Sequence, residues 1–414
     1  MRGVDGRTQW DALVVGAGPA GSAVATLLAR TGCAVLLLDR ARFPRDKPCS
    51  EYLSPAATAV LDRLGSGILK EVEGTAHARL RGMRVVAPSG ASMVGHFAAA
   101  HAHAPPRPYS FALPRTAFDS ILRRAAEEAG AVVHEGFAVD DLLVERGRVA
   151  GVVARGPDGR RGSLHARVVV GADGLRSVVA RRLGVRRVSF PRRVAFTAHV
   201  AHAAGVEDFG EMHIGPSGGG YVGLGPIGDG LTTVALVLPR AELRRRPRDP
   251  RRAFLAELDR FPGLRGRFDR ARLVREVLTT GPFAQWSRRV TADGACLVGD
   301  AADFFDPFTG QGIYNALRGA ELAAAAIARA LAAHDAVTAR ALAPYARARR
   351  AEFAGKWVLE RLIGFGVGWP ALAERVVTRL ARRPALADLL VGATGNFVPA
   401  RAVLHPAALG RMLL

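Results

Sequence analysis

Lysine, cysteine and aromatic residues are scarce in this 414-residue sequence. Lysine occurs only at Lys47, Lys70 and Lys356, although lysine and arginine together number 58 and the formal net charge is +21. Arginine therefore carries almost all of the positive charge. It is spread along the chain without the interleaved aromatic residues, helix-turn-helix pattern or zinc pattern of nucleic-acid-binding proteins. We therefore expect no nucleic-acid partner.

The three cysteines, Cys33, Cys49 and Cys296, are isolated from one another. Their spacing suggests neither a disulfide framework nor a metal-binding cluster. His101 and His103 form a His-x-His pair, but no carboxylate or cysteine lies close to them in the sequence. No metal site is predicted.

Apolar runs long enough to span a membrane are missing, and no signal peptide is evident. We expect a cytoplasmic protein, and the length allows two domains. Residues 356–369 are both basic and apolar. This segment could contact the inner face of a membrane as a peripheral anchor, cover a pocket, or pack as an ordinary helix.

Glycine, by contrast, is concentrated in a motif near the N-terminus. An apolar run, Ala12 to Val15, predicts a buried strand, and Gly16, Gly18 and Gly21 follow at the G-x-G-x-x-G spacing. Such glycines permit a tight turn, let the backbone approach a pyrophosphate, and let the next helix pack closely. The motif predicts a dinucleotide site.

The residues after this motif strengthen the prediction. A helix is expected from about Ala20 to Arg30, with its N-terminal amides facing the pyrophosphate. A second buried strand, Ala34 to Leu38, ends at Asp39, about 20 residues past the glycines, where an acid can bind ribose hydroxyls.

The strand and helix pattern continues through residues 110–185 and then changes. Between residues 192 and 240, short strands are joined by glycine- or proline-rich turns, which predicts an antiparallel sheet. A hairpin over residues 80–94 is expected to join it. Residues 241–270 are expected to be helical, and the tail after residue 341 is expected to form helices broken at Gly364, Pro370, Pro384 and Pro399.

Two further buried strands end in polar turns. One runs into Ala172-Asp173-Gly174 and the other into Gly299-Asp300. Because ligands of doubly wound sheets bind at the carboxyl ends of the strands, these turns are expected to meet the first glycine turn. A long helix starts at Gly310–Ile313, and its N-terminal amides would stabilise the negative charge of a reduced flavin. FAD is therefore favoured over NAD as the tightly bound cofactor.

Three segments, in this order and spacing, resemble the fingerprints of the FAD-dependent aromatic hydroxylases of the para-hydroxybenzoate hydroxylase fold. They are Gly16-Ala17-Gly18-Pro19-Ala20-Gly21, Ala172-Asp173-Gly174-Leu175-Arg176-Ser177 and Gly299-Asp300-Ala301. Geranylgeranyl reductases and flavin halogenases share this fold, and the resemblance covers about residues 10–335.

The resemblance implies an α/β chain. A Rossmann-like FAD-binding domain would be interleaved with an antiparallel-sheet substrate domain and followed by a helical C-terminal tail. The expected bounds are 1–75, 106–190 and 275–335 for the FAD-binding domain, 76–105 and 191–274 for the substrate domain, and 336–414 for the tail.

The resemblance also implies which residues hold FAD. The pyrophosphate would lie on the turn from Gly16 to Gly21, and the adenosine ribose would lie on Asp39 beside Arg40. The remaining contacts would come from Arg115, Asp173 and Gly174 along the dinucleotide, from Gly299 and Asp300 at the ribityl chain or pyrophosphate, and from Pro307, Gly310, Gln311, Gly312 and Ile313 at the flavin ring. NAD(P)H would bind only transiently as electron donor, because no second nucleotide motif is present.

Three functions follow from the resemblance. The first is an NAD(P)H-using monooxygenase that hydroxylates a lipophilic or phenolic, secondary-metabolite-like compound with molecular oxygen through a C4a-hydroperoxyflavin. The alternatives are a geranylgeranyl-reductase-type reductase of isoprenoid or other alkene double bonds, and a non-catalytic lipid carrier. Halogenation is not expected, because the Trp-x-Trp-x-Ile-Pro segment of the halogenases is absent.

The reductase alternative depends on two segments. The loop from Phe43 to Cys49 is similar to the loop of geranylgeranyl reductases in which a cysteine lies close to the flavin. The Tyr-x-Trp-x-Phe-Pro segment of those reductases, however, reads Tyr221-Val-Gly223-Leu-Gly225-Pro226 here. Both large side chains are replaced by glycine, and we therefore expect the monooxygenase.

Cys49, Tyr221 and His213 are the candidate catalytic residues. Cys49 could be a redox or proton-donating group, or an inert buried thiol. Tyr221, His213 and the nearby His199 lie on predicted strands of the substrate sheet and could face the flavin. A purely structural role is the alternative for each of the three.

Overall fold

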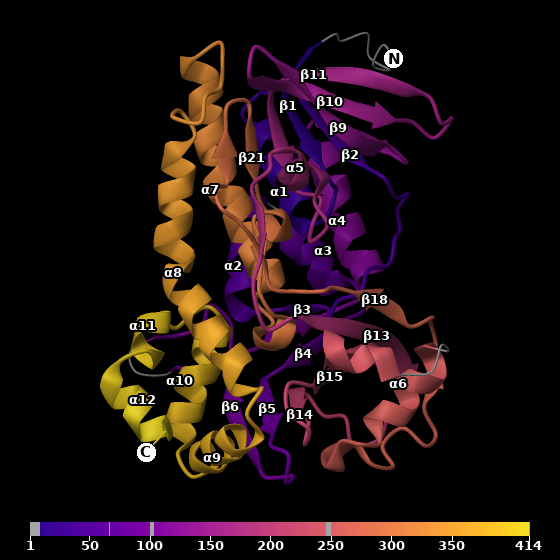
Figure 1. Cartoon of the computed structure of the whole chain (residues 1–414), viewed down its shortest axis with the longest axis vertical. Coiled ribbons are helices and arrows are strands. Elements are labelled where there is room, and N and C mark those ends of the chain that lie inside the picture. Colours follow the sequence, from indigo (N-terminus) through magenta and orange to yellow (C-terminus); the bar gives the residue numbers. More distant parts are fainter. Residues whose placement is uncertain (1–8, 66, 100–102, 246–249, 414) are drawn as a thin grey trace.

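Two large sheets, one above the other, organise the computed structural model, which describes residues 9–65, 67–99, 103–245 and 250–413 (Figure 1). The N-terminal strand belongs to the upper sheet. The C-terminal helices run down one side of the molecule and end beside the lower sheet. The chain crosses between the two sheets several times, so each sheet is built from separate stretches of sequence.

The upper sheet has the strand order β20–β21–β11–β1–β2–β8, and β10 and β9 extend it from β11. Strands β21, β11, β1, β2 and β8 run parallel. The bounds are β1 Gln9–Val15, β2 Val35–Asp39, β8 Val132–Glu135, β9 Ala138–Glu145, β10 Arg148–Arg155, β11 Arg161–Gly171, β20 Thr291–Ala292 and β21 Ala295–Leu297.

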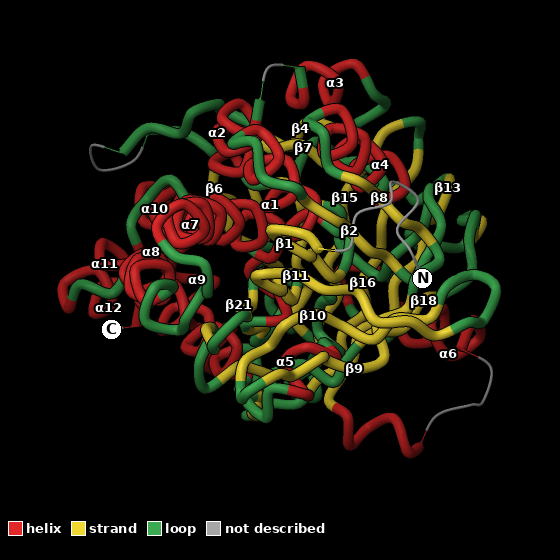
Figure 2. The backbone as a smooth tube through the Cα atoms, turned by 90° about the horizontal axis from the view of Figure 1, so that it is seen from above, coloured by secondary structure: helices red, strands yellow, loops and turns green. Residues whose placement is uncertain are grey.

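Helices cover one face of the upper sheet, and the short helix α5 packs with residues of β9 and β10 on the other face, which explains why the parallel strands are apolar without alternation. Ala12 and Val14 of β1 pack into a core with the helices of one face, whereas Leu13 and Val15 pack into the core of the other face. Figure 2 shows α5 on the opposite side of the sheet from α1, α2, α3 and α4. The bounds are α1 Pro19–Arg30, α2 Pro55–Leu64, α3 Ile68–Gly74, α4 Arg115–Glu128, α5 Val178–Arg182 and α7 Gly312–Ala333.

The lower sheet has the order β17–β13–β16–β15–β14–β5–β6, and β18 also pairs with β13. The hairpin of β5 and β6 joins it through a parallel pairing with β14, as the sequence predicts. This sheet continues to residue 280, past residue 274. The bounds are β5 Gly82–Val86, β6 Ser92–His96, β13 Arg193–Ala201, β14 Gly210–Ile214, β15 Tyr221–Gly228, β16 Leu231–Pro239, β17 Arg272–Leu273 and β18 Leu278–Thr280.

Two three-stranded sheets connect these layers, with the orders β3–β7–β4 and β12–β19–β22. The bounds are β3 Tyr52–Leu53, β4 Ala78–Leu80, β7 Ser110–Ala112, β12 Arg186–Val188, β19 Gln285–Ser287 and β22 Asp303–Phe304. The short helical turns are η1 Arg240–Arg245, η2 Pro262–Leu264, η3 Gly299–Ala301 and η4 Pro307–Thr309. The remaining helices are α6 Pro250–Leu258, α8 Ala343–Gly366, α9 Pro370–Ala381, α10 Pro384–Thr394, α11 Ala400–Val403 and α12 Pro406–Leu413.

Two local predictions need correction. Gly364 does not break a helix, because α8 continues to Gly366 and a side chain at Gly364 would come within 3.1 Å of the Phe305 ring. Of residues 241–245 and 250–270, which the structure describes, only those in η1, α6 and η2 are helical.

His101 lies outside the described residues, so the structure does not place the His-x-His pair. Among the helices that the structure describes, none combines the length and the apolar composition needed to cross a bilayer.

Candidate active site

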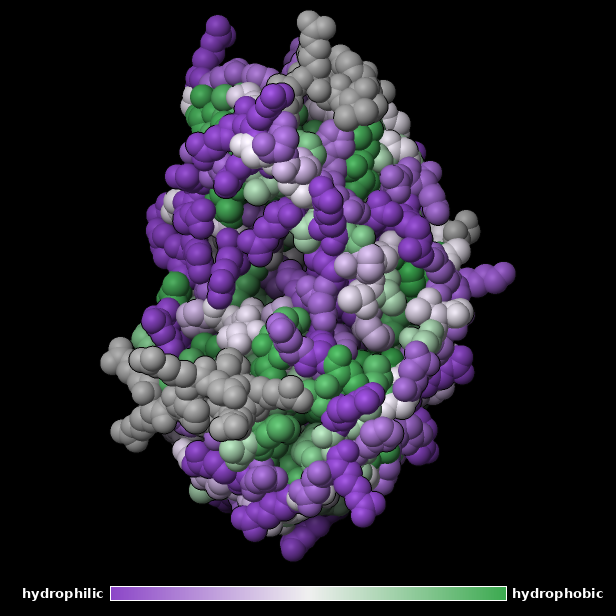
Figure 3. Space-filling view, turned by 90° about the vertical axis from the view of Figure 1, so that its right-hand side faces the viewer, coloured by the Kyte–Doolittle hydropathy of each residue, from purple (hydrophilic) through white to green (hydrophobic). Residues whose placement is uncertain are grey.

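A cavity lies between the two large sheets, and residues from the three predicted strand ends line it. The face of the molecule that carries β18 and α6 is hollowed between its upper and lower halves (Figure 3). The upper lining consists of Gly18, Pro19, Ala20, Ala172, Gly174, Gly299 and Asp300, together with Pro307, Gly310, Gly312 and Ile313. Segments more than 100 residues apart in sequence therefore meet at one site.

The first glycine turn has the geometry that the motif predicts. Gly16 has a φ of +99°, and a side chain there would lie 2.6 Å from the carbonyl oxygen of Ala172. A side chain at Gly21 would lie 1.8 Å from the carbonyl oxygen of Gly16, so helix α1 packs tightly onto the turn. Gly18, in contrast, faces the cavity. The backbone there is open to a ligand at the positive end of α1.

Asp39 is buried at the end of β2 and braces this turn. Its Oδ2 accepts a hydrogen bond from the backbone N–H of Ala17 at 2.8 Å, and its Oδ1 accepts one from Ala41 at 2.8 Å. Asp39 is not among the residues that line the cavity, and Arg40 beside it is exposed. The contact of these two residues with an adenosine ribose stays a prediction.

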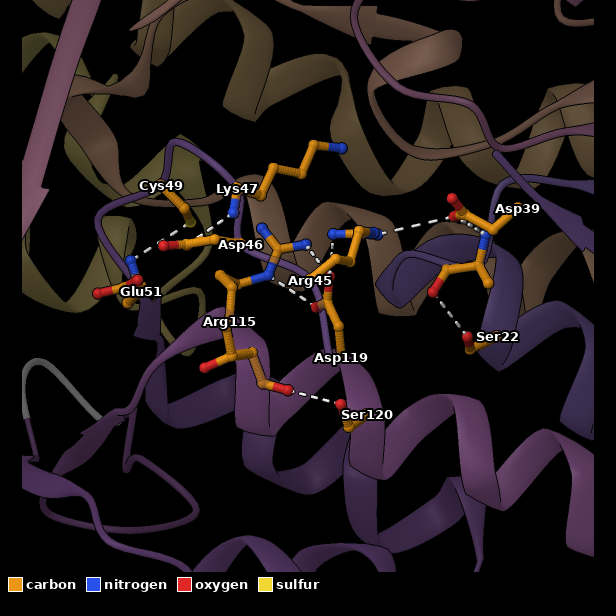
Figure 4. A network of polar contacts seen from close by, with 12 residues as sticks. Ser22, Asp39, Arg45, Asp46, Lys47, Cys49, Glu51, Arg115, Asp119 and Ser120 are labelled. Carbon is orange, nitrogen blue, oxygen red and sulfur yellow. Dashed lines mark hydrogen bonds and ion pairs between the residues drawn. The ribbon is translucent and has the colours of Figure 1, made fainter. Parts of the chain in front are cut away.

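Two arginines share one buried carboxylate near the glycine turn (Figure 4). Arg115, at the start of α4, donates two hydrogen bonds of 2.7 Å to Asp119, which is fully buried. Arg45 forms a 2.8 Å ion pair with the same carboxylate and reaches to within 3.9 Å of Asp39. Arg115 lines the cavity, as expected.

Lys47 is a further cation that the sequence-based site did not include. Its side chain points away from Arg45 in Figure 4 and lines the cavity, and a Cβ at Gly174 would lie 3.3 Å from its Nζ. Burial, together with the Arg115 and Arg45 guanidinium groups, lowers the pKa of Lys47. The cation nearest Gly174 and Asp300 therefore lies in a strongly positive environment that favours an anionic ligand.

Asp300 and Asp173 play different parts. Asp300 lines the cavity, and burial raises its pKa although Lys47 and Arg115 oppose that effect. Asp173 does not line the cavity. Its Oδ2 accepts a 2.6 Å hydrogen bond from the N–H of Val178 at the start of α5, and burial raises its pKa. Its neighbours Ala172 and Gly174 provide the cavity wall instead.

The loop before α7 supplies a second helix N-terminus. Gly310 has a φ of +66°, and a Cβ there would meet the Tyr52 ring at 2.8 Å. Pro307, Gly310, Gly312 and Ile313 all line the cavity. Gln311 does not, because its side chain is buried and donates a 3.1 Å hydrogen bond to the carbonyl of Ala393 in α10.

Cys49 lines the cavity through the loop that precedes β3. Its Sγ accepts a 3.3 Å hydrogen bond from the backbone N–H of Glu51, a residue with a positive φ of 61°. The thiol also lies close enough to the Arg115 guanidinium to affect the Arg115 pKa. Cys49 therefore places a thiol in the cavity lining, beside Arg115.

Tyr221 lines the cavity with its ring, but its hydroxyl is engaged elsewhere. The phenol donates a 2.6 Å hydrogen bond to Oδ1 of Asp306, and burial together with this carboxylate raises the Tyr221 pKa well above its ordinary value. Asp306 is itself held by Arg193 at 2.6 Å. The hydroxyl is poorly placed to give a proton to a substrate.

His213 and His199 each lie in a buried ion-pair cluster. His213 does not line the cavity, and its Nε2 lies 2.8 Å from Glu211. Hydrogen bonds from Arg267 and His213 outweigh burial and lower the pKa of Glu211 to about 2. His199 lies beside Glu51 in the same manner. Of the three candidate catalytic residues, Cys49 and Tyr221 line the cavity, and the Tyr221 hydroxyl is bound to Asp306.

The residues at the upper wall fit FAD. Gly18 and Gly310 leave the backbone open beside two helix N-termini, and Arg115 and Lys47 supply positive charge between them. A pyrophosphate requires such a cationic, glycine-lined turn, and a reduced flavin ring is stabilised by a helix N-terminus.

Comparison with known families agrees with this geometry. Residues 9–357 match the family model described as FAD binding domain. The chain belongs to this FAD-binding family. It is accordingly an FAD-dependent oxidoreductase, and the predicted fold is confirmed.

Two relatives and one solved structure are similar to this chain over most of its length. The chain is 32% identical over 330 residues to a digeranylgeranylglycerophospholipid reductase of Methanothrix thermoacetophila, and the aligned region covers 78% of this chain and 79% of that one. It is 32% identical over 329 residues to a menaquinone reductase of Mycobacterium tuberculosis, covering 76% and 75%. A flavoprotein/dehydrogenase of Cytophaga hutchinsonii shares the fold with a TM-score of 0.83 at 20% identity, covering 98% and 96%.

Proposed function

We propose that this protein is an FAD-dependent reductase of carbon–carbon double bonds in an isoprenoid-bearing, lipophilic substrate, with NAD(P)H as the electron donor. The observation that carries the proposal is the position of the Cys49 thiol in the cavity lining, opposite the lower sheet and beside Arg115. Relatives at 32% identity that are named as reductases of isoprenoid compounds support the same conclusion.

The hydroxylation expected from the sequence is the weaker reading. That expectation depended on the loss of two large side chains at Gly223 and Gly225. Both relatives described above are named as reductases, and the findings therefore favour the alternative that the Cys49 loop suggested.

Most of the cavity floor on the lower sheet consists of small and apolar residues, with Glu211 and Tyr221 as the exceptions. Gly223 pairs with Ala235 on one side and Met212 on the other, and Thr197 pairs with Ala235 beyond it. Gly225 and Gly210 lie in the next row. With so few large side chains, this floor suits a wide or branched hydrocarbon better than a small phenol.

The chemistry divides between the cofactor and the protein. When bound and reduced by NAD(P)H, FAD would supply the hydride that adds to one carbon of the double bond. Cys49 would give a proton from its Sγ to the other carbon, and solvent would restore that proton. Arg115 and the Glu51 N–H would stabilise the thiolate left behind. The apolar floor would exclude water from the reacting carbons.

An anaerobic assay tests this function. The holoprotein is incubated without oxygen with reduced FAD and either a geranylgeranyl phospholipid or menaquinone, and products are measured by mass spectrometry. We expect a gain of two hydrogens per reduced bond without oxygen. A requirement for oxygen, with a gain of one oxygen atom, would support hydroxylation instead.

The cysteine is tested with a matched pair of variants. Cys49→Ala should lower turnover about 100-fold or more, within the range for loss of a positioned proton donor, while FAD content stays at the wild-type level. Cys33→Ala is the control, because Cys33 is a free cysteine that does not line the cavity. Equal turnover in both variants would remove Cys49 from the mechanism.

A further inference from the structure

One face of helix α8 binds residues 303–306, the segment that precedes the cavity-lining residue Pro307. Arg349 forms an ion pair with Asp303, and Glu360 accepts a 3.1 Å hydrogen bond from the backbone N–H of Asp306. The carbonyl of Gly364 accepts a 2.8 Å hydrogen bond from Arg193. The inner face of α8 is therefore fixed against residues 303–306, which lead into the loop before α7.

The outer face of the same helix is apolar and exposed. Val358, Leu362, Phe365 and Trp369 are 48%, 50%, 54% and 70% exposed. Their spacing of four, three and four residues places them on one stripe, which continues just past the end of α8. Single exposed apolar residues are normal, but a row of four large ones indicates a contact surface.

The charges around this stripe all have one sign. Both acidic residues of α8 turn inward: Glu352 accepts hydrogen bonds from Tyr314 and Lys356, and Glu360 faces Asp306. Arg347 and Arg350 are exposed. Arg347 precedes Val358 by eleven residues, about three turns, and so lies on the same side of the helix.

We propose that the stripe Val358–Leu362–Phe365–Trp369 docks α8 onto the surface of an anionic lipid bilayer, with Arg347 and Arg350 at the headgroup phosphates. An apolar helix face bordered by arginines is the pattern of helices that lie in the membrane interface. The net charge of +21 adds long-range attraction to such a surface. The proposal goes beyond the reaction and does not depend on which bond is reduced.

Docking in this orientation would also bring the bilayer close to the site. The ring centroid of Phe365 in the stripe lies 6.4 Å from that of Phe305. Phe305 does not line the cavity itself, but its neighbour in sequence, Phe304, does.

Vesicle co-sedimentation of the full-length holoprotein tests the proposal. The vesicles are phosphatidylcholine alone or phosphatidylcholine mixed with phosphatidylglycerol. The stripe variant carries Leu362→Glu, Phe365→Glu and Trp369→Glu, and the charge variant carries Arg347→Glu and Arg350→Glu. Val144→Glu is the matched control, because Val144 is 57% exposed on β9 in the upper sheet. FAD content and thermal unfolding establish that each variant is folded.

We expect the wild type and the control to bind phosphatidylglycerol vesicles, and less so at high salt. The stripe variant should bind at least about tenfold more weakly, and the charge variant roughly fivefold more weakly per arginine. The proposal would be overturned if the wild-type protein did not co-sediment with these vesicles. Equal binding of stripe and control variants would also overturn it, as would sedimentation velocity showing a wild-type dimer that the stripe variant dissociates without any effect on vesicle binding.

Failure of this test would leave the proposed reaction intact, because turnover in the anaerobic assay can be measured with detergent-dispersed substrate. Conversely, vesicle binding without any turnover would contradict the proposed function alone.

Discussion

The Nε2 atom of His199 lies 2.7 Å from both carboxylate oxygens of Glu51. His199 belongs to β13 of the lower sheet, and Glu51 belongs to the loop that carries Cys49 between the two sheets. Arg275 extends the cluster, because it pairs with Asp46 at the other end of the same loop and lies 3.7 Å from Glu51. The lower sheet thus fixes the loop at two points on either side of the thiol.

Glu51 is therefore expected to act as a positioning residue for Cys49. A non-glycine residue at a φ of 61° costs of order 1–3 kcal/mol and persists only where its surroundings enforce it. Glu51→Ala would remove the contacts to His199 and Arg275 and release the loop. We expect turnover to fall and Cys49 to be alkylated faster by iodoacetamide.

Peptide mass spectrometry gives the alkylation rate at each cysteine, with Cys33 as the internal control. Glu51→Gln keeps the side-chain length and should retain more of the wild-type rate than Glu51→Ala. If both variants alkylate at Cys49 as slowly as the wild type, the His199–Glu51 pair does not position the thiol.

Lys47 should contribute to FAD affinity. The ammonium group lines the cavity beside Gly174, and its pKa is lowered by burial and by Arg115 and Arg45, which is consistent with a site arranged for an anion. A hydrogen bond to a charged group contributes about 1.5–3 kcal/mol, so Lys47→Met should weaken FAD binding by roughly 10- to 100-fold. Flavin fluorescence during titration of the apoprotein measures the Kd.

Lys70 provides the matched control for this prediction, because it is exposed on α3 and distant from the cavity lining. Lys70→Met should leave the Kd unchanged. The same loss in both variants would indicate a general effect of net charge rather than a contact with the cofactor.

The sequence predicts the cofactor site better than the catalytic groups, for a physical reason. Backbone turns such as that at Gly16 require particular residues at fixed spacing, so the motif specifies its own geometry. The catalytic candidates depend more on partners far away in the chain, because Glu211, which binds His213, is itself held by Arg267, 56 residues later. Tyr221, for example, is bound to Asp306, which is 85 residues later.

Lys47 and Glu51 could have been found from the sequence only in part. Lys47 is one of three lysines in a chain that otherwise uses arginine, which marks it as unusual. Glu51 gives no such signal, because its positive φ and its pairing with His199 arise only when β13 packs against the loop. The folded chain brings together residues 148 positions apart.

Gly223 is expected to set the width of the substrate cavity, on the assumption that the proposed reaction is correct. It lies in the row that includes Thr197 and Ala235, and a side chain there would first meet the flexible thioether of Met212 at 3.1 Å. Gly223→Trp should lower kcat/KM for menaquinone, which has a ring, more than for a linear geranylgeranyl phospholipid. We expect Gly223→Ala to have a small effect on both.

Steady-state kinetics with the two substrates measures this difference, and FAD content confirms that the cavity retains its cofactor. An equal decrease for both substrates would show that Gly223 does not distinguish ring from chain.

Glu360 should make stability depend on pH. Burial, with the nearby Asp303 and Asp306, raises its pKa to about 8, although the N–H of Asp306 opposes the shift. The folded protein therefore binds a proton at this site that the unfolded chain releases above its ordinary pKa of about 4.3. Because the folded state binds the extra proton, the contribution to stability is present at low pH and is lost as pH rises between these values.

Glu360→Gln removes this titration and keeps an amide oxygen that can accept from Asp306. We expect the free energy of unfolding of the variant, relative to wild type, to rise between pH 5 and pH 8 by an amount on the order of a few kcal/mol. Urea unfolding of the holoprotein at several pH values measures it. Glu374→Gln is the control, because Glu374 is half-buried on α9 and its hydrogen bonds to Ser89 lie near the surface. A difference between Glu360→Gln and wild type that stays constant with pH would mean that Glu360 is ionised in the folded protein.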